Sequence, residues 1–200
     1  MSDPTVHVVD DDAAIRDALS WLLRSRGLSA RSWDSGEAFL AAWSPDMAGC
    51  IVLDVRMDGM SGVEAYDRLL ERGCAMPVLF LTGNGDVPLA VAALKKGAFD
   101  FVEKPFNDNH LVDRLLEALR SDEALRRARE AEASVAERLA HLTPREREVM
   151  DRILTGEYNK TIADGLAIAV RTVEVHRAHV FEKMGVRSAV ELARLVARGR

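Results

Sequence analysis

The chain has 200 residues, of which 48% are hydrophobic and 30% are charged, and its formal net charge is −5. These values lie near globular averages and exclude a disordered or fibrous chain. The N-terminus lacks a basic segment followed by an apolar stretch, and no run approaches the roughly 18 apolar residues of a membrane span, so we expect a soluble cytoplasmic protein with no membrane partner. Charge is divided unevenly, because residues 1–120 have a net charge of −7 and residues 141–200 a net charge of +3.

Short β-rich runs alternate with longer amphipathic stretches through about residue 119. The expected strands are residues 6–9, 29–33, 50–53, 78–81 and 99–102, and the expected helices are residues 14–26, 36–43, 62–72, 88–96 and 108–119. Such alternation indicates parallel strands joined by right-handed helical crossovers, with helices on both faces of the sheet. The pattern predicts a doubly wound, five-stranded α/β domain. Two isolated cysteines next to apolar segments, Cys50 and Cys74, are expected to be buried and reduced.

Polar residues follow four of the expected strands. Asp10 and Asp11 follow the first strand, Asp54 the third, Thr82 the fourth and Lys104 the fifth. In open α/β sheets, ligands bind in the crevice beyond the carboxyl ends of the strands. Carboxylates, a hydroxyl and an ammonium that converge there suit a hard cation and a phosphoryl group.

Residues 107–142 contain neither Gly nor Pro, which favours one long helix. Its apolar residues at heptad-like spacing are Leu125, Ala128, Val135, Leu139 and Leu142. Two interpretations stay open: a linker helix that dimerises through this seam, and a solvated connector that breaks at Ser121 and Asp122.

The pattern of the 58 or so residues after His141 predicts four helices. Thr143, Pro144 and Glu146 form a good helix start, with a capping residue, a proline at the first position and a Glu at the third. Residues 159–185 read as a helix, a short turn and a second helix rich in basic residues, which is typical of a helix-turn-helix.

Four strings, VHVVDDD, LDVRMDGMSG, LTGNGD and FDFVEKPF, resemble in order and spacing the receiver domain of two-component response regulators. The strings LTPREREVM, NKTIA, RTVEVHRAHVFEKMGVRS and AVELARLV resemble the LuxR-type DNA-binding domain. Together they are similar to the FixJ branch of the FixJ/NarL family. The resemblance implies a (βα)5 receiver domain over residues 1–120, a helical linker over residues 121–140 and a four-helix DNA-binding domain over residues 141–200.

For the receiver, the resemblance implies that Asp54 accepts a phosphoryl group from a sensor histidine kinase. Mg²⁺ would relieve the repulsion between the carboxylates, with Asp11, Asp54 and the Arg56 backbone carbonyl as ligands and Asp10 bound partly through water. Lys104 would neutralise phosphoryl oxygens.

The same resemblance implies a switch in which Thr82 moves to bind the phosphoryl group and Phe101 turns inward, although ordinary core packing explains Phe101 equally well. It also implies a cis peptide bond before Pro105. Two positions depart from the family pattern. Asp58 replaces a common proline, so we expect a more mobile loop and an extra carboxylate near the metal, and Asn84 replaces a frequent histidine.

In the second helix of a helix-turn-helix, N-terminal side chains reach into the major groove of DNA. The residues expected to face the groove are Thr172, Glu174, Val175 and Arg177, and those expected to contact phosphates or base edges are Lys160, Arg171, His176, His179 and Lys183. Core positions are expected at Ile162, Val173, Val180 and Met184. His176 and His179 are three residues apart, but a metal site there would lack a nearby third ligand. Ala169 replaces the usual capping Ser, and Gly165 weakens the preceding helix, so we expect weak DNA binding without dimerisation.

The resulting hypothesis is a transcription factor that dimerises on phosphorylation and binds promoter DNA, with RNA polymerase as a further candidate partner. Its dimer face is left open between the first helix with the fifth strand and the fourth helix with the fifth strand and fifth helix. We expect no enzyme activity beyond phosphotransfer to Asp54 and its autodephosphorylation. One alternative, a haloacid-dehalogenase-like phosphatase, needs a second Asp where Arg56 stands. The other alternative is a regulator that acts only through protein–protein contacts.

Overall fold

The computed structural model describes residues 3–83 and 87–198, so that Asn84 lies outside the described residues. The chain divides into two compact units, Met1–Leu125 and Arg126–Arg200. None of the described helices combines the length and the hydropathy that a membrane span requires.

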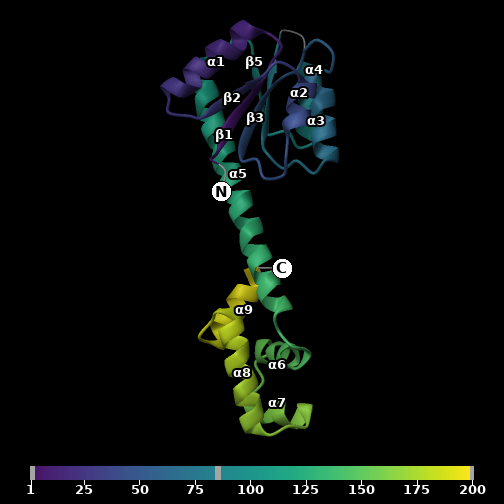
Figure 1. Cartoon of the computed structure of the whole chain (residues 1–200), viewed down its shortest axis with the longest axis vertical. Helices are drawn as coiled ribbons and strands as arrows, with labels where there is room; N and C mark the ends of the chain where they lie inside the picture. Colours follow the sequence, from purple (N-terminus) through teal and green to yellow (C-terminus); the bar gives the residue numbers. More distant parts are fainter. Residues whose placement is uncertain (1–2, 84–86, 199–200) are drawn as a thin grey trace. The chain divides into compact units, whose positions relative to one another are not determined.

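The first unit is built on a five-stranded parallel sheet with the strand order β2-β1-β3-β4-β5 (Figure 1). The strands are β1 (Thr5–Val9), β2 (Ala30–Trp33), β3 (Gly49–Asp54), β4 (Val78–Thr82) and β5 (Asp100–Glu103). The order reverses between β1 and β3, which is the doubly wound arrangement predicted from the sequence.

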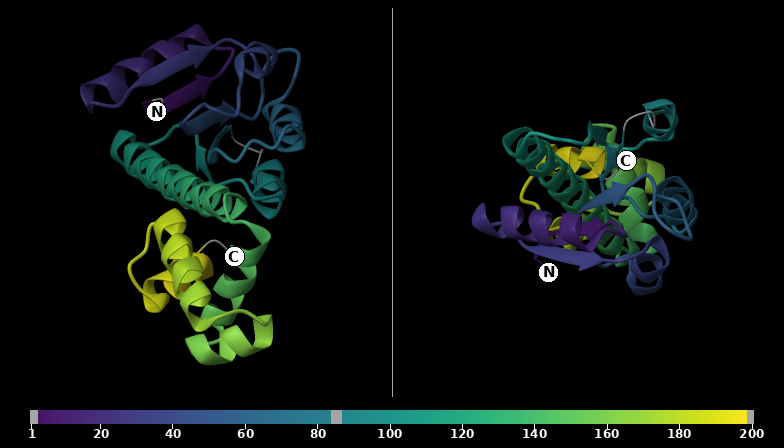
Figure 2. Two further views of the ribbon diagram at one scale, coloured as in Figure 1. Left: turned by 60° about the horizontal axis from the view of Figure 1, so that its bottom comes forward. Right: turned by 90° about the horizontal axis from the view of Figure 1, so that it is seen from above.

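Helices cover both faces of this sheet (Figures 1 and 2). They are α1 (Ala13–Ser25), α2 (Gly36–Ala42), α3 (Gly62–Glu71), α4 (Val87–Lys95) and α5 (Asp108–Ala140). One apolar cluster joins α1 and α5 to the sheet, and a second joins α2, α3 and α4 to the opposite face. The central strands β3 and β4 are buried along their whole length, which explains their continuous apolar runs. Cys50 and Cys74 are free and buried, as predicted.

Helix α5 continues through Ser121 and Asp122, so the interpretation with a break at these residues is wrong. The Asp122 side chain is only 4% exposed and accepts a hydrogen bond of 2.9 Å from the Gly49 amide. Gly49 has φ +126°, and a Cβ there would lie 2.0 Å from the Thr5 carbonyl oxygen, so this strand start requires glycine. Burial, followed by the charge of Asp122, raises the pKa of Cys50 to about 12.

The second unit contains four helices after the end of α5: α6 (Pro144–Leu154), α7 (Asn159–Leu166), α8 (Val170–Met184) and α9 (Ala189–Arg198). The predicted capping box forms, because the Thr143 and Glu146 side chains each accept a hydrogen bond from the other residue's backbone amide. The four predicted core residues, Ile162, Val173, Val180 and Met184, are fully buried. Helices α7 and α8 pack together as a helix-turn-helix pair.

Two features at the turn between these helices bear on its stability. Ala169 is the N-cap of α8 and provides no side-chain hydrogen bond, as predicted. Gly165 has a packing role that sequence reasoning missed, because a Cβ there would lie 2.5 Å from a guanidinium nitrogen of Arg152. That guanidinium also pairs with Glu157 at 3.0 Å. The Arg152 side chain therefore lies directly over Gly165 on α7, although the end of this flexible chain could move aside for a larger residue.

Candidate functional site

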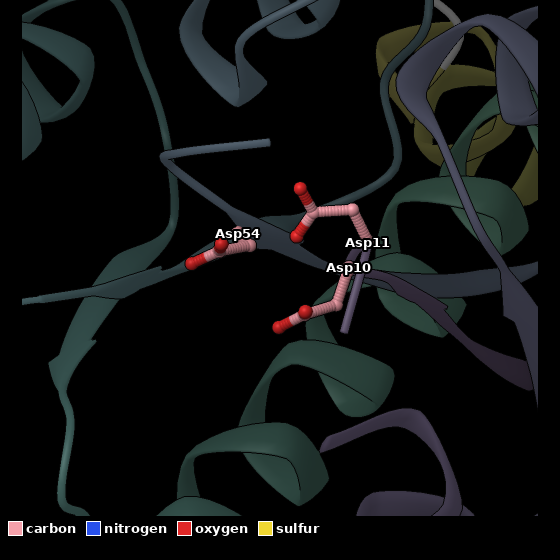
Figure 3. A group of neighbouring side chains, drawn as sticks. All are labelled: Asp10, Asp11 and Asp54. Carbon is pink, nitrogen blue, oxygen red and sulfur yellow. The ribbon is translucent and has the colours of Figure 1, made fainter. Parts of the chain in front are cut away.

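Three carboxylates meet at the carboxyl ends of the central strands (Figure 3). Asp54 is the last residue of β3, and Asp10 and Asp11 follow β1. Because Val9 pairs with Leu53, the next residues of the two strands stand side by side. One oxygen from each carboxylate lies within 4.8 Å of the others. Asp10 and Asp54 are only 1% and 7% exposed, whereas Asp11 is exposed.

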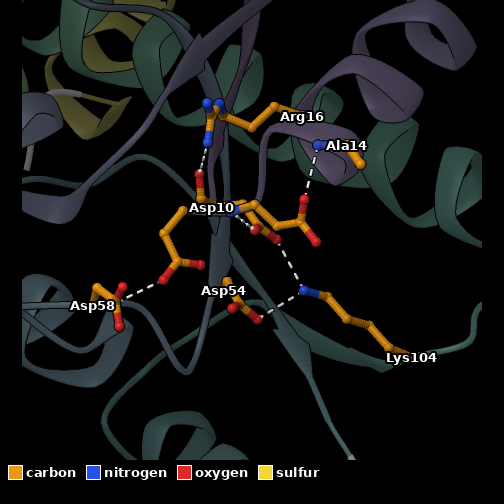
Figure 4. Close-up of polar contacts among 8 residues, drawn as sticks. Asp10, Ala14, Arg16, Asp54, Asp58 and Lys104 are labelled. Carbon is orange, nitrogen blue, oxygen red and sulfur yellow. Dashed lines mark hydrogen bonds and ion pairs between the residues drawn. The ribbon is translucent and has the colours of Figure 1, made fainter.

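Lys104, which follows β5, supplies the positive charge of this group (Figure 4). Its Nζ lies 2.9 Å from Asp10 Oδ2 and 3.0 Å from Asp54 Oδ1. The next peptide bond, to Pro105, is cis, as the resemblance implied. We call Asp10, Asp11, Asp54 and Lys104 the acidic site.

Electrostatics in the acidic site are set by burial and by the shared ammonium. Burial raises the pKa of Asp54, the hydrogen bond and charge of Lys104 oppose this, and the other two carboxylates add to the increase. Burial disfavours the charged Lys104 ammonium, but its two carboxylate partners outweigh that effect and raise its pKa. Three carboxylates with one ammonium leave an excess of negative charge, which a cation would offset.

Two hydrogen bonds, one from a backbone amide and one from an arginine side chain, hold Asp10 in place. Its Oδ1 accepts a hydrogen bond of 2.9 Å from the Asp12 amide, and its carbonyl oxygen accepts one of 2.7 Å from the Arg16 guanidinium. The Asp12 side chain in turn caps α1 by accepting from the Ala14 amide (Figure 4). The same set of hydrogen bonds therefore caps α1 and orients the Asp10 side chain.

The backbone amide of Asp58 makes a contact that sequence reasoning did not identify. Its backbone amide donates a hydrogen bond of 2.6 Å to Asp11 Oδ2, a bond that proline at this position could not make (Figure 4). The Met60 amide donates to Glu37 Oε1 at 3.1 Å, and the Gly62 amide donates to the Val55 carbonyl at 3.0 Å. These bonds hold the loop at three points, and the mobility expected from the missing proline stays a prediction.

Thr82, the last residue of β4, lies next to Lys104, whose amide donates a hydrogen bond of 2.7 Å to the Thr82 carbonyl. The Thr82 side chain is fully buried, and its Oγ1 has no hydrogen-bond partner among the residues that the structure describes. A buried hydroxyl without a partner costs about 1–3 kcal/mol, so its retention needs an explanation.

Two other residues were predicted to take part in this site, Phe101 and the Arg56 backbone carbonyl. Phe101 pairs with Phe80 in the sheet register and is half-buried against the cluster beneath α2, α3 and α4. Arg56 is exposed in the loop between β3 and α3, two residues after Asp54. Its position in the chain allows a backbone carbonyl near the acidic site.

The donor atoms of the acidic site fit a hard divalent cation. Its three candidate ligands are all carboxylate oxygens, which Mg²⁺ and related cations prefer, whereas zinc prefers nitrogen and sulfur. The Asp58 amide occupies one oxygen of Asp11 and leaves the other oxygen for a cation.

The second unit presents the residues predicted to bind DNA on α7 and α8. Those that are exposed are Lys160, Arg171, Thr172, Glu174, Val175, His179 and Lys183. His176 and Arg177 are half-buried, and the Arg177 guanidinium lies 5.4 Å from the ring centre of Phe181. At the other end of α8, Arg138 donates a hydrogen bond of 2.8 Å to the Met184 carbonyl.

Lys183 and His179 have an intramolecular partner that sequence reasoning missed. Lys183 Nζ lies 2.6 Å from Glu146 Oε2, and His179 Nδ1 lies 3.6 Å from Glu146 Oε1. The hydrogen bond from Lys183 is the main reason why the pKa of Glu146 is lowered to about 2. The sequence identified Glu146 only as a capping residue, and no local signal links it to a lysine 37 positions later.

Comparisons with known proteins match both units. The family model of the response regulator receiver domain matches residues 6–116, and that of the bacterial regulatory proteins of the luxR family matches residues 140–196. The C4-dicarboxylate transport transcriptional regulatory protein DctR of Rhodobacter capsulatus is 53% identical over 193 residues, which cover 96% of this chain and 98% of DctR. The transcriptional regulatory protein FixJ of Bradyrhizobium diazoefficiens is 45% identical, with 96% and 94% of the two chains covered.

Solved structures agree with these matches. The response regulator StyR is similar with a TM-score of 0.93 and 40% identity, over 98% of this chain and all of StyR. Full-length FixJ from B. japonicum is similar with a TM-score of 0.62 and 43% identity, over 100% and 98% of the two chains. The receiver domain implies a sensor kinase as partner, and the LuxR-type domain implies promoter DNA. This chain belongs to the two-component response regulators of the FixJ/NarL type, which are transcription factors with a receiver domain and a LuxR-type DNA-binding domain.

Proposed function

We propose that Asp54 accepts a phosphoryl group from a sensor histidine kinase in a Mg²⁺-dependent reaction, and that this modification promotes dimerisation and promoter binding. The observation that carries the proposal is the acidic site together with the buried Thr82 hydroxyl beside it, which finds no hydrogen-bond partner in the described part of the chain. An anion-binding ammonium, an unused hydroxyl donor and a strand-end carboxylate are the groups that an aspartyl phosphate needs.

The acidic site would hold Mg²⁺ through Asp10, Asp11 and Asp54, with the Arg56 carbonyl as a further ligand. When bound, the ion supplies positive charge that neutralises the carboxylates and the phosphoryl oxygens. Neutralisation of the carboxylates matters because two carboxylates about 4 Å apart repel each other by about 4 kcal/mol at an effective dielectric constant near 20.

In the proposed transfer, an oxygen of the Asp54 carboxylate attacks phosphorus while the bond from phosphorus to the kinase imidazole nitrogen breaks. The electron pair of that bond returns to the imidazole, and an acyl phosphate remains on Asp54. Lys104, which contacts Asp54 before transfer, then binds a phosphoryl oxygen. The Thr82 hydroxyl donates to another oxygen, which satisfies a group that lacks a described partner beforehand.

The output depends on an element with two arrangements that bind the phosphoryl oxygens differently. We assign that role to Thr82 and to Phe101, which is half-buried and lies in the strand next to Thr82. A coupling of about 1–3 kcal/mol would change a dimerisation constant by roughly 5- to 150-fold. The dimer would use one of the two faces considered above. It would bind a promoter in the cytoplasm, where RNA polymerase is a further candidate partner.

Promoter contact is assigned to α8 and to Lys160 on α7. Thr172, Glu174, Val175 and Arg177 are proposed to face the major groove, and Arg171, His176, His179, Lys183 and Lys160 to contact phosphates or base edges. The uncapped start of α8 at Ala169 supports weak binding by a single copy.

Labelling with acetyl phosphate in the presence of Mg²⁺ tests the acceptor. We expect one phosphoryl group per wild-type chain and none on Asp54→Asn, with Asp58→Asn as a matched control that keeps the label. Unchanged labelling of Asp54→Asn would refute the assignment.

Two further measurements separate the alternatives. Multiple turnovers on a small phosphomonoester would favour a phosphatase, because an acceptor domain is labelled only stoichiometrically. A gel shift of the phosphorylated protein without sequence preference or salt dependence would favour a regulator that acts through protein contacts alone.

A further inference from the structure

The loop between β3 and α3 is tied both to the acidic site and to helix α2. The Asp58 amide donates to Asp11, and the Met60 amide donates to Glu37 on the first turn of α2. We call this arrangement of Glu37, the Met60 and Asp58 amides and Asp11 the loop clasp. It connects the Glu37 carboxylate, which lies outside the acidic site, to the Asp11 carboxylate inside it through loop residues 58–60.

Glu37 is held by a firmly packed element. Phe39 and Leu40, on the same short helix, are buried in the apolar cluster on that face of the sheet. The preceding Gly36 lets the start of α2 pack closely on α3, because a Cβ there would lie 3.0 Å from the Ala65 side chain. Glu37 therefore binds the loop from a helix that is itself fixed by its packing.

Loop conformation at the clasp also depends on Gly59. Its φ of +80° is a left-handed conformation that favours glycine, and a Cβ there would lie 3.1 Å from Glu37 Oε1. The turn at Gly59 brings the amides on either side of it, at Asp58 and Met60, to acceptors on two different elements.

We propose that Glu37 is a positioning residue for the cation and phosphoryl chemistry of the acidic site. By accepting from the Met60 amide it fixes the loop, so that the Asp58 amide orients Asp11 and leaves one Asp11 oxygen for the cation. The same constraint fixes the backbone that carries the Arg56 carbonyl. Ligands ordered in advance lose less entropy on binding, so the clasp raises the affinity for Mg²⁺. This inference rests on the proposed magnesium site.

Calorimetric titration of the full chain with Mg²⁺, without a phosphodonor, tests the proposal. Glu37→Ala removes the acceptor and its charge, whereas Glu37→Gln keeps an acceptor oxygen and removes only the charge. Asp58→Pro removes the amide donor, whereas Asp58→Asn keeps it. We expect Glu37→Ala and Asp58→Pro to weaken Mg²⁺ binding by about tenfold, and the two matched controls to stay close to the wild type.

Amide hydrogen exchange in the metal-free protein gives an independent readout. The Met60 amide should exchange faster in Glu37→Ala than in the wild type or in Glu37→Gln. Unchanged Met60 exchange, wild-type Mg²⁺ affinity in Glu37→Ala, or equal losses in Glu37→Ala and Glu37→Gln would each overturn the clasp. Absence of Mg²⁺ binding by the wild type would instead refute the magnesium site of the proposed function.

Discussion

Replacing Thr82 with Val should stabilise the unphosphorylated protein and abolish its response to a phosphoryl group. The Thr82 side chain is fully buried, and its hydroxyl has no partner among the described residues. Valine has nearly the same shape and suits a strand, so the change removes an unsatisfied group without creating a cavity. An unsatisfied buried hydroxyl costs about 1–3 kcal/mol, and we therefore expect a gain of about 1 kcal/mol in the free energy of unfolding.

Urea unfolding followed by tryptophan fluorescence reports on the unit that contains Thr82, because all three tryptophans, Trp21, Trp33 and Trp43, lie in that first unit. Thr82→Ser is the matched control, since it keeps the hydroxyl and loses a methyl group worth about 1 kcal/mol. Adding beryllofluoride with Mg²⁺ should stabilise the wild type much more than Thr82→Val. A Thr82→Val protein less stable than the wild type would show that the hydroxyl is already satisfied, and the reasoning would fail.

Three other predictions concern stability. Asp122→Ala should lower the free energy of unfolding by about 1–3 kcal/mol in urea, because it removes the acceptor of a buried amide, whereas the exposed Asp113→Ala on the same helix should change little. The pKa of Glu146 is depressed, so its contribution to the free energy of unfolding is complete above about pH 4.5 and is lost as pH falls towards 2. Unfolding followed by circular dichroism should therefore show that acid reduces the stability of Glu146→Gln less than that of the wild type or of Glu148→Gln. Mg²⁺ at a hundred times its dissociation constant should raise the stability of the wild type by about 2.7 kcal/mol in fluorescence-monitored urea unfolding, and Asp11→Asn should lose most of this gain.

Local patterns were sufficient to predict the fold and the aspartates that meet in it. The apolar runs of β3 and β4 are continuous because these strands are buried on both faces, and each ends in a polar residue at the same edge of the sheet. Strand β1 ends at Val9 and is followed at that edge by Asp10. Once β1 and β3 pair in parallel with Val9 beside Leu53, the residues that follow, Asp10 and Asp54, lie next to each other whatever the details of the loops. The capping box at Thr143 was similarly local.

Contacts between distant segments could not be predicted in this way. The bond from the Asp58 amide to Asp11 uses a backbone group, which every residue except proline possesses. Asp122 looks like an ordinary helix-surface carboxylate and Glu146 like a capping residue only, yet the first is buried against Gly49 and the second against Lys183. Their roles depend on which surfaces meet in the folded chain, and neither periodicity nor a short motif records that.

Sedimentation velocity of the full chain, with and without beryllofluoride and Mg²⁺, tests most directly whether occupancy of the acidic site controls assembly. We expect the wild type to sediment as a monomer alone and as a dimer with both additions, and Asp54→Asn to stay monomeric throughout. A wild-type protein that sediments identically under both conditions, or an Asp54→Asn protein that dimerises like the wild type, would contradict the account.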